Sequence, residues 1–234
     1  MAVSQQLPLP FGLDPEFTFE RFLAGPNLEA VRLLTSVAEG SGPMPVFIHG
    51  PSGSGKTHLL QATCMASGHL GQLAMTLPLT LVKDQGPSLI EGLDGLDCLC
   101  LDGLECIAGE MEWEHALFSL FNALKDQGAR LVIAANTPPG QLPFALADLR
   151  SRMASGPIIA LKPLSELETI QAMIGYARSL GLEMSEPVAQ YLFRRVDRDL
   201  GSLLRHLDQL DRASMAAARK LTIPFIRTFI DPGT

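Results

Sequence analysis

The chain has little that would place it in a membrane or outside the cell. No apolar run approaches the roughly 20 residues that a helix needs to span a bilayer. The first residues, "MAVSQQLPLPFG", lack the charged and apolar regions of a signal peptide. With 234 residues, of which 47% are hydrophobic, the chain can bury a substantial core. We therefore expect a globular, cytoplasmic protein without a membrane partner.

Positive charge is also lacking overall. The formal net charge is -7 and the pI is about 5.2, so the average surface does not attract a phosphate backbone. The segment from Arg194 to Arg227 is locally basic, with seven arginines and one lysine against four aspartates. Mixed signs on helical faces nevertheless favour an ordinary solvated surface over a nucleic-acid site. Direct, sequence-specific DNA binding is therefore not expected.

Cysteine is scarce, and its spacing does not predict a zinc site. The four cysteines are Cys64, Cys98, Cys100 and Cys106, and no second Cys or His pair stands at zinc spacing. Cys98 and Cys100 lie two apart, on one face of an apolar strand. We therefore predict buried, reduced thiols and no metal other than magnesium.

Five short apolar segments predict β-strands. Helical patterns separate several of them, including residues 55–67 and 110–128, where apolar residues recur at intervals of three and four. Near-continuously apolar strands that alternate with helices indicate an α/β fold with a parallel sheet covered on both faces. The predicted strands are 45–50, 72–77, 97–102, 130–136 and 157–161.

From Pro163 onward the patterns are helical. Ser165 with Glu168 three residues later is typical of a helix N-terminus, and Thr222 followed by Pro224 marks another. The sequence therefore predicts three parts, which are an extended proline-bearing tail (1–14), an α/β domain (15–162) and a small all-helical domain (163–234).

The chemistry begins at residues 50–57, "GPSGSGKT", which match G-x-x-x-x-G-K-[ST] directly after a strand and before a helix. In this context the glycines permit a tight loop whose backbone N–H groups surround phosphates, and the helix N-terminus adds its positive end. Lys56 would reach the β- and γ-phosphates. The predicted nucleotide-binding residues here are Gly50, Pro51, Ser52, Gly53, Ser54, Gly55, Lys56, Thr57 and His58.

A magnesium site is predicted beside this loop. Thr57 would place its hydroxyl on Mg²⁺, and Asp102, at the end of the strand "CLCLD", would hold the same ion. Many ATPases carry a second acid next, to orient the attacking water, whereas Gly103 has no side chain to do so. Glu105 follows three residues after Asp102, and because it leaves the strand end we expect it to point elsewhere.

Two further polar residues have both a functional and a structural interpretation. Asn136 ends the strand "RLVIAAN", where its side chain could meet the γ-phosphate or its water, but an Asn before "TPPG" also suits a turn. Arg198 stands at a helix start in the small domain and could reach the nucleotide, although such arginines are often simply solvated.

Four stretches together resemble the Hda family, regulatory homologues of the bacterial replication initiator DnaA within the AAA+ ATPases. The resemblance implies a P-loop AAA+ nucleotide-binding domain followed by a helical lid, and an adenine nucleotide, ADP rather than ATP, with Mg²⁺. DnaA has a further DNA-binding domain, and this sequence stops at Thr234 without one, in agreement with its acidic charge. The stretches are "FTFERFLAGPN" (17–27), "GPSGSGKTHLLQA" (50–62), "LCLDGLECIAG" (99–109) and "LDQLDRASMAAARKLTIPF" (207–225).

The resemblance also implies roles for single residues. By position, Asn136 corresponds to the sensor at a strand end, Arg198 to the lid sensor arginine, and Phe22 to a residue beside the base. Arg152 in "LADLRSRM" corresponds to an arginine finger given in trans to a neighbouring subunit, and Arg150 is its rival. The family has an aromatic-glycine pair soon after the finger, whereas "MASG" follows here, which puts the local loop geometry in question.

The implied function is regulation of replication initiation. A protein of this family docks on the DNA polymerase sliding clamp and stimulates ATP hydrolysis by DnaA, so it needs little hydrolysis of its own. The N-terminal "QLPLPF" resembles the clamp-binding peptide of the family, and its prolines restrict it before binding, which lowers the entropy cost. The implied clamp-binding residues are Gln6, Leu7, Leu9, Pro10 and Phe11.

Two other functions remain open at this stage. One is an AAA+ ATPase in its own right, such as a helicase loader, against which Gly103 argues. The other is a paralogue that binds DNA or membrane through the arginine-bearing lid, against which the net charge argues. The resident nucleotide and a homo-oligomeric state are not determined by the residues.

Overall fold

The computed structural model describes residues 17–196, 200–217 and 221–230. These residues form two compact units. The first holds residues up to 22, 27–50 and 56–161, and the second holds 23–26, 51–55 and the described residues from 162 onward. The predicted clamp-binding residues 6–11 and Arg198 lie outside the described residues.

The first unit is built on a sheet of five strands in the order β2-β3-β4-β1-β5, with every neighbouring pair parallel. All five predicted strands are confirmed within one or two residues at each end. Because parallel strands run the same way, their carboxyl ends meet along one edge of the sheet. The strands are β1 (Val46–His49), β2 (Ala74–Pro78), β3 (Cys98–Asp102), β4 (Arg130–Ala135) and β5 (Ile158–Ala160).

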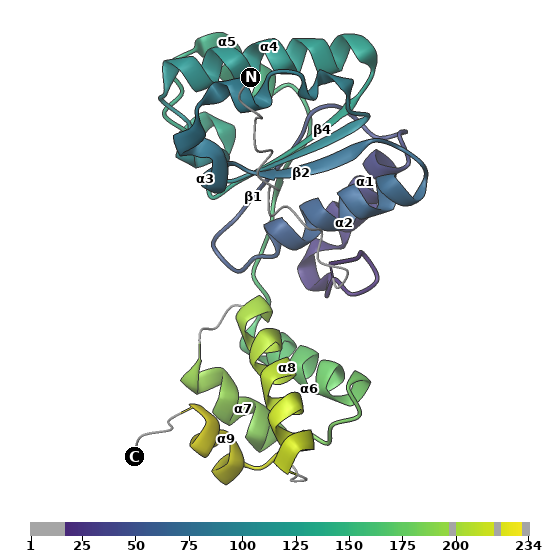
Figure 1. Cartoon of the computed structure of the whole chain (residues 1–234), viewed down its shortest axis with the longest axis vertical. Helices are drawn as coiled ribbons and strands as arrows, with labels where there is room; N and C mark the ends of the chain where they lie inside the picture. The colour runs from purple at the N-terminus through teal and green to yellow at the C-terminus, as the bar shows by residue number, and fades with distance from the viewer. Residues whose placement is uncertain (1–16, 197–199, 218–220, 231–234) are drawn as a thin grey trace, which may run out of the picture. The chain divides into compact units, whose positions relative to one another are not determined.

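Helices cover both faces of this sheet, as Figure 1 shows. On one face, Phe47, Leu101 and Ile133 pack with α4 (Met111–Gln127) and α5 (Ala147–Met153). On the other face, residues one position along the same strands, such as Ile48 and Val132, pack with α1 (Leu28–Ala38) and α2 (Lys56–His69). Burial on both faces explains why the strands read as continuous apolar runs. The predicted α/β class is confirmed.

Helices α1 and α5 were not predicted from the sequence. Apolar residues at positions 30, 34 and 37 of α1 recur at helical spacing and lie in the core, so this pattern was the available signal. A short helix α3 (Leu79–Val82) and several single 3-10 turns complete the connections. Of the four cysteines, Cys64, Cys98 and Cys100 are buried as predicted, while Cys106 is only half-buried.

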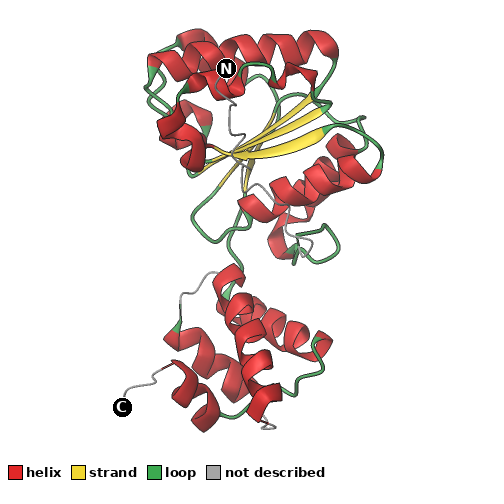
Figure 2. Ribbon diagram, in the orientation of Figure 1, coloured by secondary structure: helices red, strands yellow, loops and turns green. Residues whose placement is uncertain are grey.

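The second unit is helical in its regular structure (Figure 2). Its helices pack around an apolar core that includes Met173, Leu192, Leu207 and Ile226. The predicted capping box is confirmed, because the Ser165 hydroxyl accepts from the Glu168 N–H while the Glu168 carboxylate accepts from the Ser165 N–H. The helices are α6 (Glu166–Ser179), α7 (Glu186–Arg195), α8 (Leu200–Ala217) and α9 (Ile223–Ile230).

Among the helices that the structure describes, none combines the length and the apolar character needed to cross a membrane.

Candidate functional site

The loop after β1 adopts a turn that only glycine makes easily. Gly53 and Gly55 have φ values of 75° and 92°, in the left-handed region where other residues are strained. The Ser54 N–H donates to the Pro51 carbonyl at 3.3 Å. Pro51 and Ser52 are exposed, whereas the Ser54 hydroxyl is buried and has no hydrogen-bond partner within the described structure. A buried hydroxyl of this kind is a polar group that a bound ligand could satisfy.

The two residues that open α2 are held by groups from the ends of three strands. Lys56 Nζ donates to the Gly50 carbonyl at 2.6 Å and to Asn136 Oδ1 at 3.1 Å. Thr57 Oγ1 donates to Asp102 Oδ2 at 2.6 Å. This arrangement follows from the parallel register, in which His49 lies beside Ala135 and Asp102 beside Ala134. The carboxyl ends of β1, β3 and β4 thereby bring these predicted site residues together.

Burial at this edge disfavours the charged forms of Lys56 and Asp102, and neighbouring groups partly offset that effect. Burial lowers the pKa of Lys56, and the nearby Glu105 and Asp102 carboxylates oppose that shift. Burial raises the pKa of Asp102, and the Thr57 hydrogen bond and the Lys56 cation oppose that shift in turn, while Glu105 adds to it. A half-buried ammonium beside a hydroxyl–carboxylate pair suits an anion with a divalent cation next to it, so Lys56, Thr57 and Asp102 fit a nucleotide phosphate with Mg²⁺.

The expectation that Glu105 points away from the site is wrong. Gly103 adopts the left-handed conformation, with φ 81° and ψ 41°, and turns the chain at the end of β3. The 3-10 turn Leu104–Cys106 then carries Glu105 back over the sheet edge, where its Oε2 accepts from the Asn136 N–H at 3.2 Å. Gly103 lacks a carboxylate of its own, but its left-handed backbone turns the chain so that the Glu105 carboxylate lies at the sheet edge.

The aromatic residues before α1 contact His58 in the first turn of α2. The ring of Phe17 stacks on His58 with 4.9 Å between centroids, and Phe22 lies 5.2 Å from it at a tilt. His58 Nε2 lies 2.8 Å from the Thr18 carbonyl, and since a carbonyl only accepts, Nε2 carries the proton. The predicted base-side residue Phe22 thus contacts the first turn of α2 through His58. Phe17, which the sequence analysis did not select, takes part in the same cluster.

The two candidate finger arginines lie on α5 in different surroundings. Arg150 is exposed and its guanidinium donates to the Phe144 carbonyl at 3.1 Å. Arg152 is half-buried, and its guanidinium carbon lies 5.8 Å from the centre of the Phe121 ring, within cation–π range. The stretch "MASG" (153–156) stands where the family has an aromatic-glycine pair. A Cβ on Gly156 would lie 1.8 Å from the Pro45 carbonyl oxygen, so the close approach of the backbone requires glycine there.

Glu114 on α4 supports the start of α5 and was not predicted from the sequence. Its side chain is fully buried, and its carboxylate accepts the backbone N–H groups of Gly109, Ala145 and Leu146 at 2.6, 3.1 and 2.6 Å. Leu146 is the N-cap position of α5, so Glu114 fixes the start of the helix that carries both arginines. The only sequence signal was an acid within a helical apolar pattern, which ordinarily predicts a solvated face.

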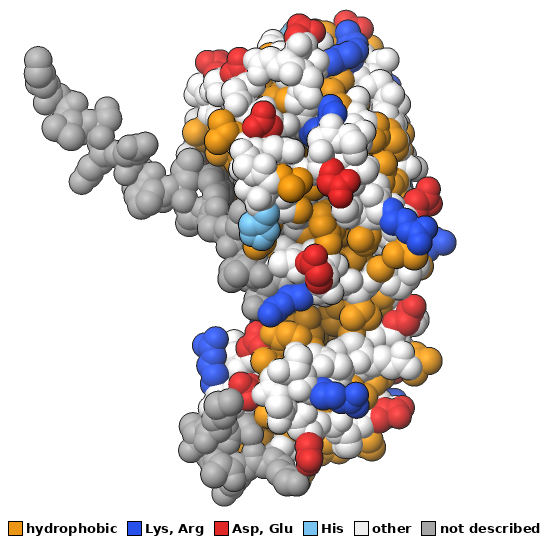
Figure 3. Space-filling model, turned by 90° about the vertical axis from the view of Figure 1, so that its right-hand side faces the viewer, with side chains coloured by type: hydrophobic (Ala, Val, Ile, Leu, Met, Phe, Trp, Pro, Cys, Tyr) orange, Lys and Arg blue, Asp and Glu red, His pale blue; other side chains and the backbone are white. Residues whose placement is uncertain are grey.

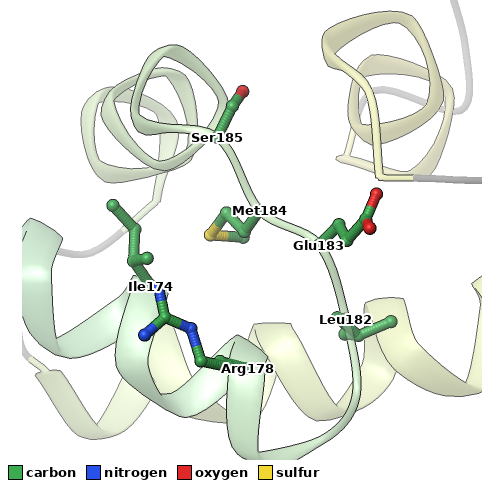
Figure 4. A pocket seen from close by; sticks show the side chains of 6 residues that line it. All are labelled: Ile174, Arg178, Leu182, Glu183, Met184 and Ser185. Carbon is green, nitrogen blue, oxygen red and sulfur yellow. The ribbon is translucent and has the colours of Figure 1, made fainter.

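A hollow in the second unit is lined by none of the predicted site residues. Side chains at the end of α6 and in the loop before α7 surround a hollow of about 430 Å³ within the second unit (Figure 4). It is lined by Ile174, Arg178, Leu182, Glu183, Met184 and Ser185. On the face drawn in Figure 3, the described acidic and basic side chains are interspersed rather than gathered by sign.

Two family profiles match the chain in succession. The profile described as the bacterial DnaA ATPase domain matches residues 13–160, which is more than half of the chain. The profile described as the Hda lid domain matches residues 166–230. The second match begins at the first residue of α6 and ends at the last residue of α9.

Solved structures agree with these profiles. Domain III of the replication initiation protein DnaA from Thermotoga maritima is 27% identical, with a TM-score of 0.76 over 94% of this chain and 100% of that chain. AMPPCP-bound DnaA from Aquifex aeolicus is 23% identical, with a TM-score of 0.69 over 87% of this chain and 66% of that chain. The RuvB branch migration motor from Thermotoga maritima shares the fold at 16% identity, with a TM-score of 0.68 over 94% and 72%.

Proposed function

The chain belongs to the DnaA family of AAA+ ATPases and carries an Hda-type lid, and on that premise we propose that it is a cytoplasmic regulator of replication initiation. It docks on the DNA polymerase sliding clamp, holds an adenine nucleotide and stimulates ATP hydrolysis by DnaA, which converts DnaA to its ADP form. The observation that carries this proposal is the match of residues 166–230 to the Hda lid.

The edge of the sheet supports the nucleotide part of the proposal. Lys56 would bind the phosphates, and Thr57 with Asp102 would hold Mg²⁺, because these three side chains already converge there. The A. aeolicus relative was solved with AMPPCP, an adenine nucleotide analogue. The bound nucleotide supplies negative charge beside the half-buried Lys56 ammonium. We take ADP as the resident nucleotide.

The finger part of the proposal assigns Arg152 to the active site of a neighbouring DnaA subunit. There its guanidinium would stabilise negative charge that develops on the γ-phosphate. In this chain Arg152 lies on α5, whose first turn is fixed by the buried Glu114. A finger needs a rigid support, since a displacement of about 1 Å can cost a hundredfold in rate.

A hydrolysis assay tests the finger. DnaA loaded with ATP is mixed with the wild-type chain, with Arg152→Ala or with Arg150→Ala, in the presence of clamp loaded on DNA. Arg152→Ala should keep nucleotide and clamp binding yet lose the stimulation, by roughly a thousandfold if the finger acts as fingers do in GTPases. If Arg150→Ala loses the stimulation and Arg152→Ala keeps it, the assignment is wrong.

The same assay separates the clamp contact from the finger. Deleting residues 1–11, or replacing both Leu7 and Leu9 with alanine, should abolish clamp binding and leave nucleotide binding intact. Stimulation should then fall, because the clamp raises the effective concentration of the regulator near DnaA. A wild-type chain that hydrolyses ATP at about one per second without DnaA would instead support a self-acting ATPase such as a helicase loader.

A further inference from the structure

Glu105 is placed where it meets the same residue as the P-loop lysine. Its carboxylate accepts from the backbone N–H of Asn136 at 3.2 Å, while the side-chain oxygen of Asn136 accepts from Lys56 Nζ at 3.1 Å. Asn136 thus joins an acid and a base at the end of β4. Since Lys donates only, the Asn136 amide must present its oxygen to Lys56. The orientation of this amide is therefore determined by its contacts.

The Glu105 carboxylate and the Lys56 ammonium lie at the same place on the sheet edge, because each contacts Asn136. Asp102 is already engaged by the Thr57 hydroxyl at 2.6 Å. Asp102 therefore lies on the side of the proposed Mg²⁺ ion, and Glu105 lies on the side of the Lys56 ammonium.

A carboxylate in this position competes with a phosphate for the lysine. In a P-loop the lysine reaches the β- and γ-phosphates, so an anion held beside Lys56 and Asn136 stands near the region that a third phosphate enters. A diphosphate leaves that region to the carboxylate. A triphosphate brings further negative charge towards Glu105 in a partly buried site, where like charges are poorly screened.

We propose that Glu105 is a specificity-determining residue that makes the site favour a nucleoside diphosphate over a nucleoside triphosphate. This inference rests on the proposed function, because it assumes that the P-loop edge binds a nucleotide. The left-handed turn at Gly103 contributes to this preference, because it places Glu105 at the edge of the sheet.

The test compares two ligands on nucleotide-free protein by titration calorimetry. ADP and β,γ-methylene-ATP, which is not hydrolysed, are titrated with Mg²⁺ into the wild-type chain and into Glu105→Gln. Glutamine can still accept from the Asn136 N–H but lacks the charge. The ratio of the Kd for the triphosphate to the Kd for the diphosphate should fall by about tenfold, which corresponds to about 1.4 kcal/mol.

Two controls separate charge at the site from charge in general. Glu112→Gln removes the same charge from an exposed position on α4 and should leave the ratio unchanged. Glu105→Asp keeps the charge on a shorter side chain and should retain part of the preference. Should Glu105→Gln fail to fold, Glu105→Ala removes the same charge and is compared with Glu105→Asp.

The outcomes are distinct. An unchanged ratio in folded Glu105→Gln overturns the inference while leaving the proposed function intact. An unchanged ratio with a loss of slow ATP hydrolysis would assign Glu105 to the reaction of water, which also overturns it. A wild-type chain that binds neither ligand refutes the nucleotide site itself, and the proposed function fails with it.

Discussion

Carboxylates are buried or half-buried at two places in the first unit, and different groups stabilise them at each place. Glu114 is fully buried, and three backbone N–H groups satisfy its oxygens. Asp102 and Glu105 are half-buried at the sheet edge, where they share the neighbourhood of Lys56. The first carboxylate joins segments of the protein to one another, whereas the other two lie beside a cation that the proposed ligand would bind.

The difference shows how a structural acid can be told from a functional one. The Glu114 carboxylate accepts from backbone donors of two loops, and such donors cannot move away without local unfolding. At the sheet edge, burial raises the pKa of Asp102 and lowers that of Lys56, so both charged forms are kept at a cost in free energy. Groups held in a disfavoured charge state are typical of sites that gain their full compensation from a ligand.

The largest expected effect comes from removing the satisfied acid. Glu114→Ala removes the acceptor of three part-buried backbone N–H donors, and a donor left without a partner costs at most about 1–3 kcal/mol. Allowing for water entry, the free energy of unfolding should fall by roughly 3–5 kcal/mol in urea titrations. Stimulation of DnaA should fall as well at temperatures where the variant is folded, because the start of α5 is no longer fixed.

A matched control for this substitution lies two residues earlier on the same helix. Glu112 is exposed, so Glu112→Ala should change the free energy of unfolding by less than about 1 kcal/mol. If the two variants proved equally stable, the Glu114 hydrogen bonds would not stabilise the fold, and Glu114 would not be a structural acid.

A smaller effect is expected at the turn that sets Glu105. Gly103→Ala places a Cβ in a left-handed conformation and 3.3 Å from the Thr80 methyl carbon, which should cost about 1–2 kcal/mol of folding free energy. Gly103→Asn should cost less, because Asn tolerates this conformation better. Gly128→Ala, also at positive φ but with nothing within 4 Å, separates the backbone strain from the Thr80 contact.

The turn at Gly103 should also affect which nucleotide the site prefers. If Gly103→Ala displaces Glu105, it should shift nucleotide preference towards the triphosphate, in the same direction as Glu105→Gln. Gly128→Ala should not. A destabilised Gly103→Ala with unchanged nucleotide preference would mean that Glu105 reaches Asn136 without this turn.

The smallest expected effect is a gain in stability. Because burial raises the pKa of Asp102 above the usual 3.8, its ionised form opposes folding of the ligand-free protein. Stability from this group is therefore present below about pH 4 and is lost as the pH rises through the folded pKa. Asp102→Asn should raise the Tm of the ligand-free chain by roughly 2 °C at pH 7.

Two readouts check this sign. The difference in Tm between Asp102→Asn and the wild type should shrink as the pH is lowered below the usual pKa of 3.8, where the carboxyl is protonated in both the folded and the unfolded chain. The same variant should lose Mg²⁺-dependent nucleotide affinity. A lower Tm at neutral pH would show instead that the Thr57 and Lys56 contacts outweigh the cost of burial.

Much of the fold could be predicted because its signals are local. The five strands are apolar runs of the right length, and the capping box at Ser165 is a pattern of four adjacent residues. The loop at residues 50–57 was predicted for the same reason, since its glycines define the turn by themselves. Helix α1 was missed although its apolar spacing was visible, and the seven-residue α5 is too short to give a clear period.

By itself, then, the sequence determined the α/β class, the positions of the strands and the glycine loop that begins α2, because each depends on residues adjacent in the chain. Only the tertiary structure decided the direction of Glu105 and the role of Glu114. Glu105 meets Asn136 across 31 positions, through the parallel register of β3 with β4 and the turn at Gly103. Glu114 finds two of its donors 31 and 32 positions away, in a loop that no local pattern brings to α4.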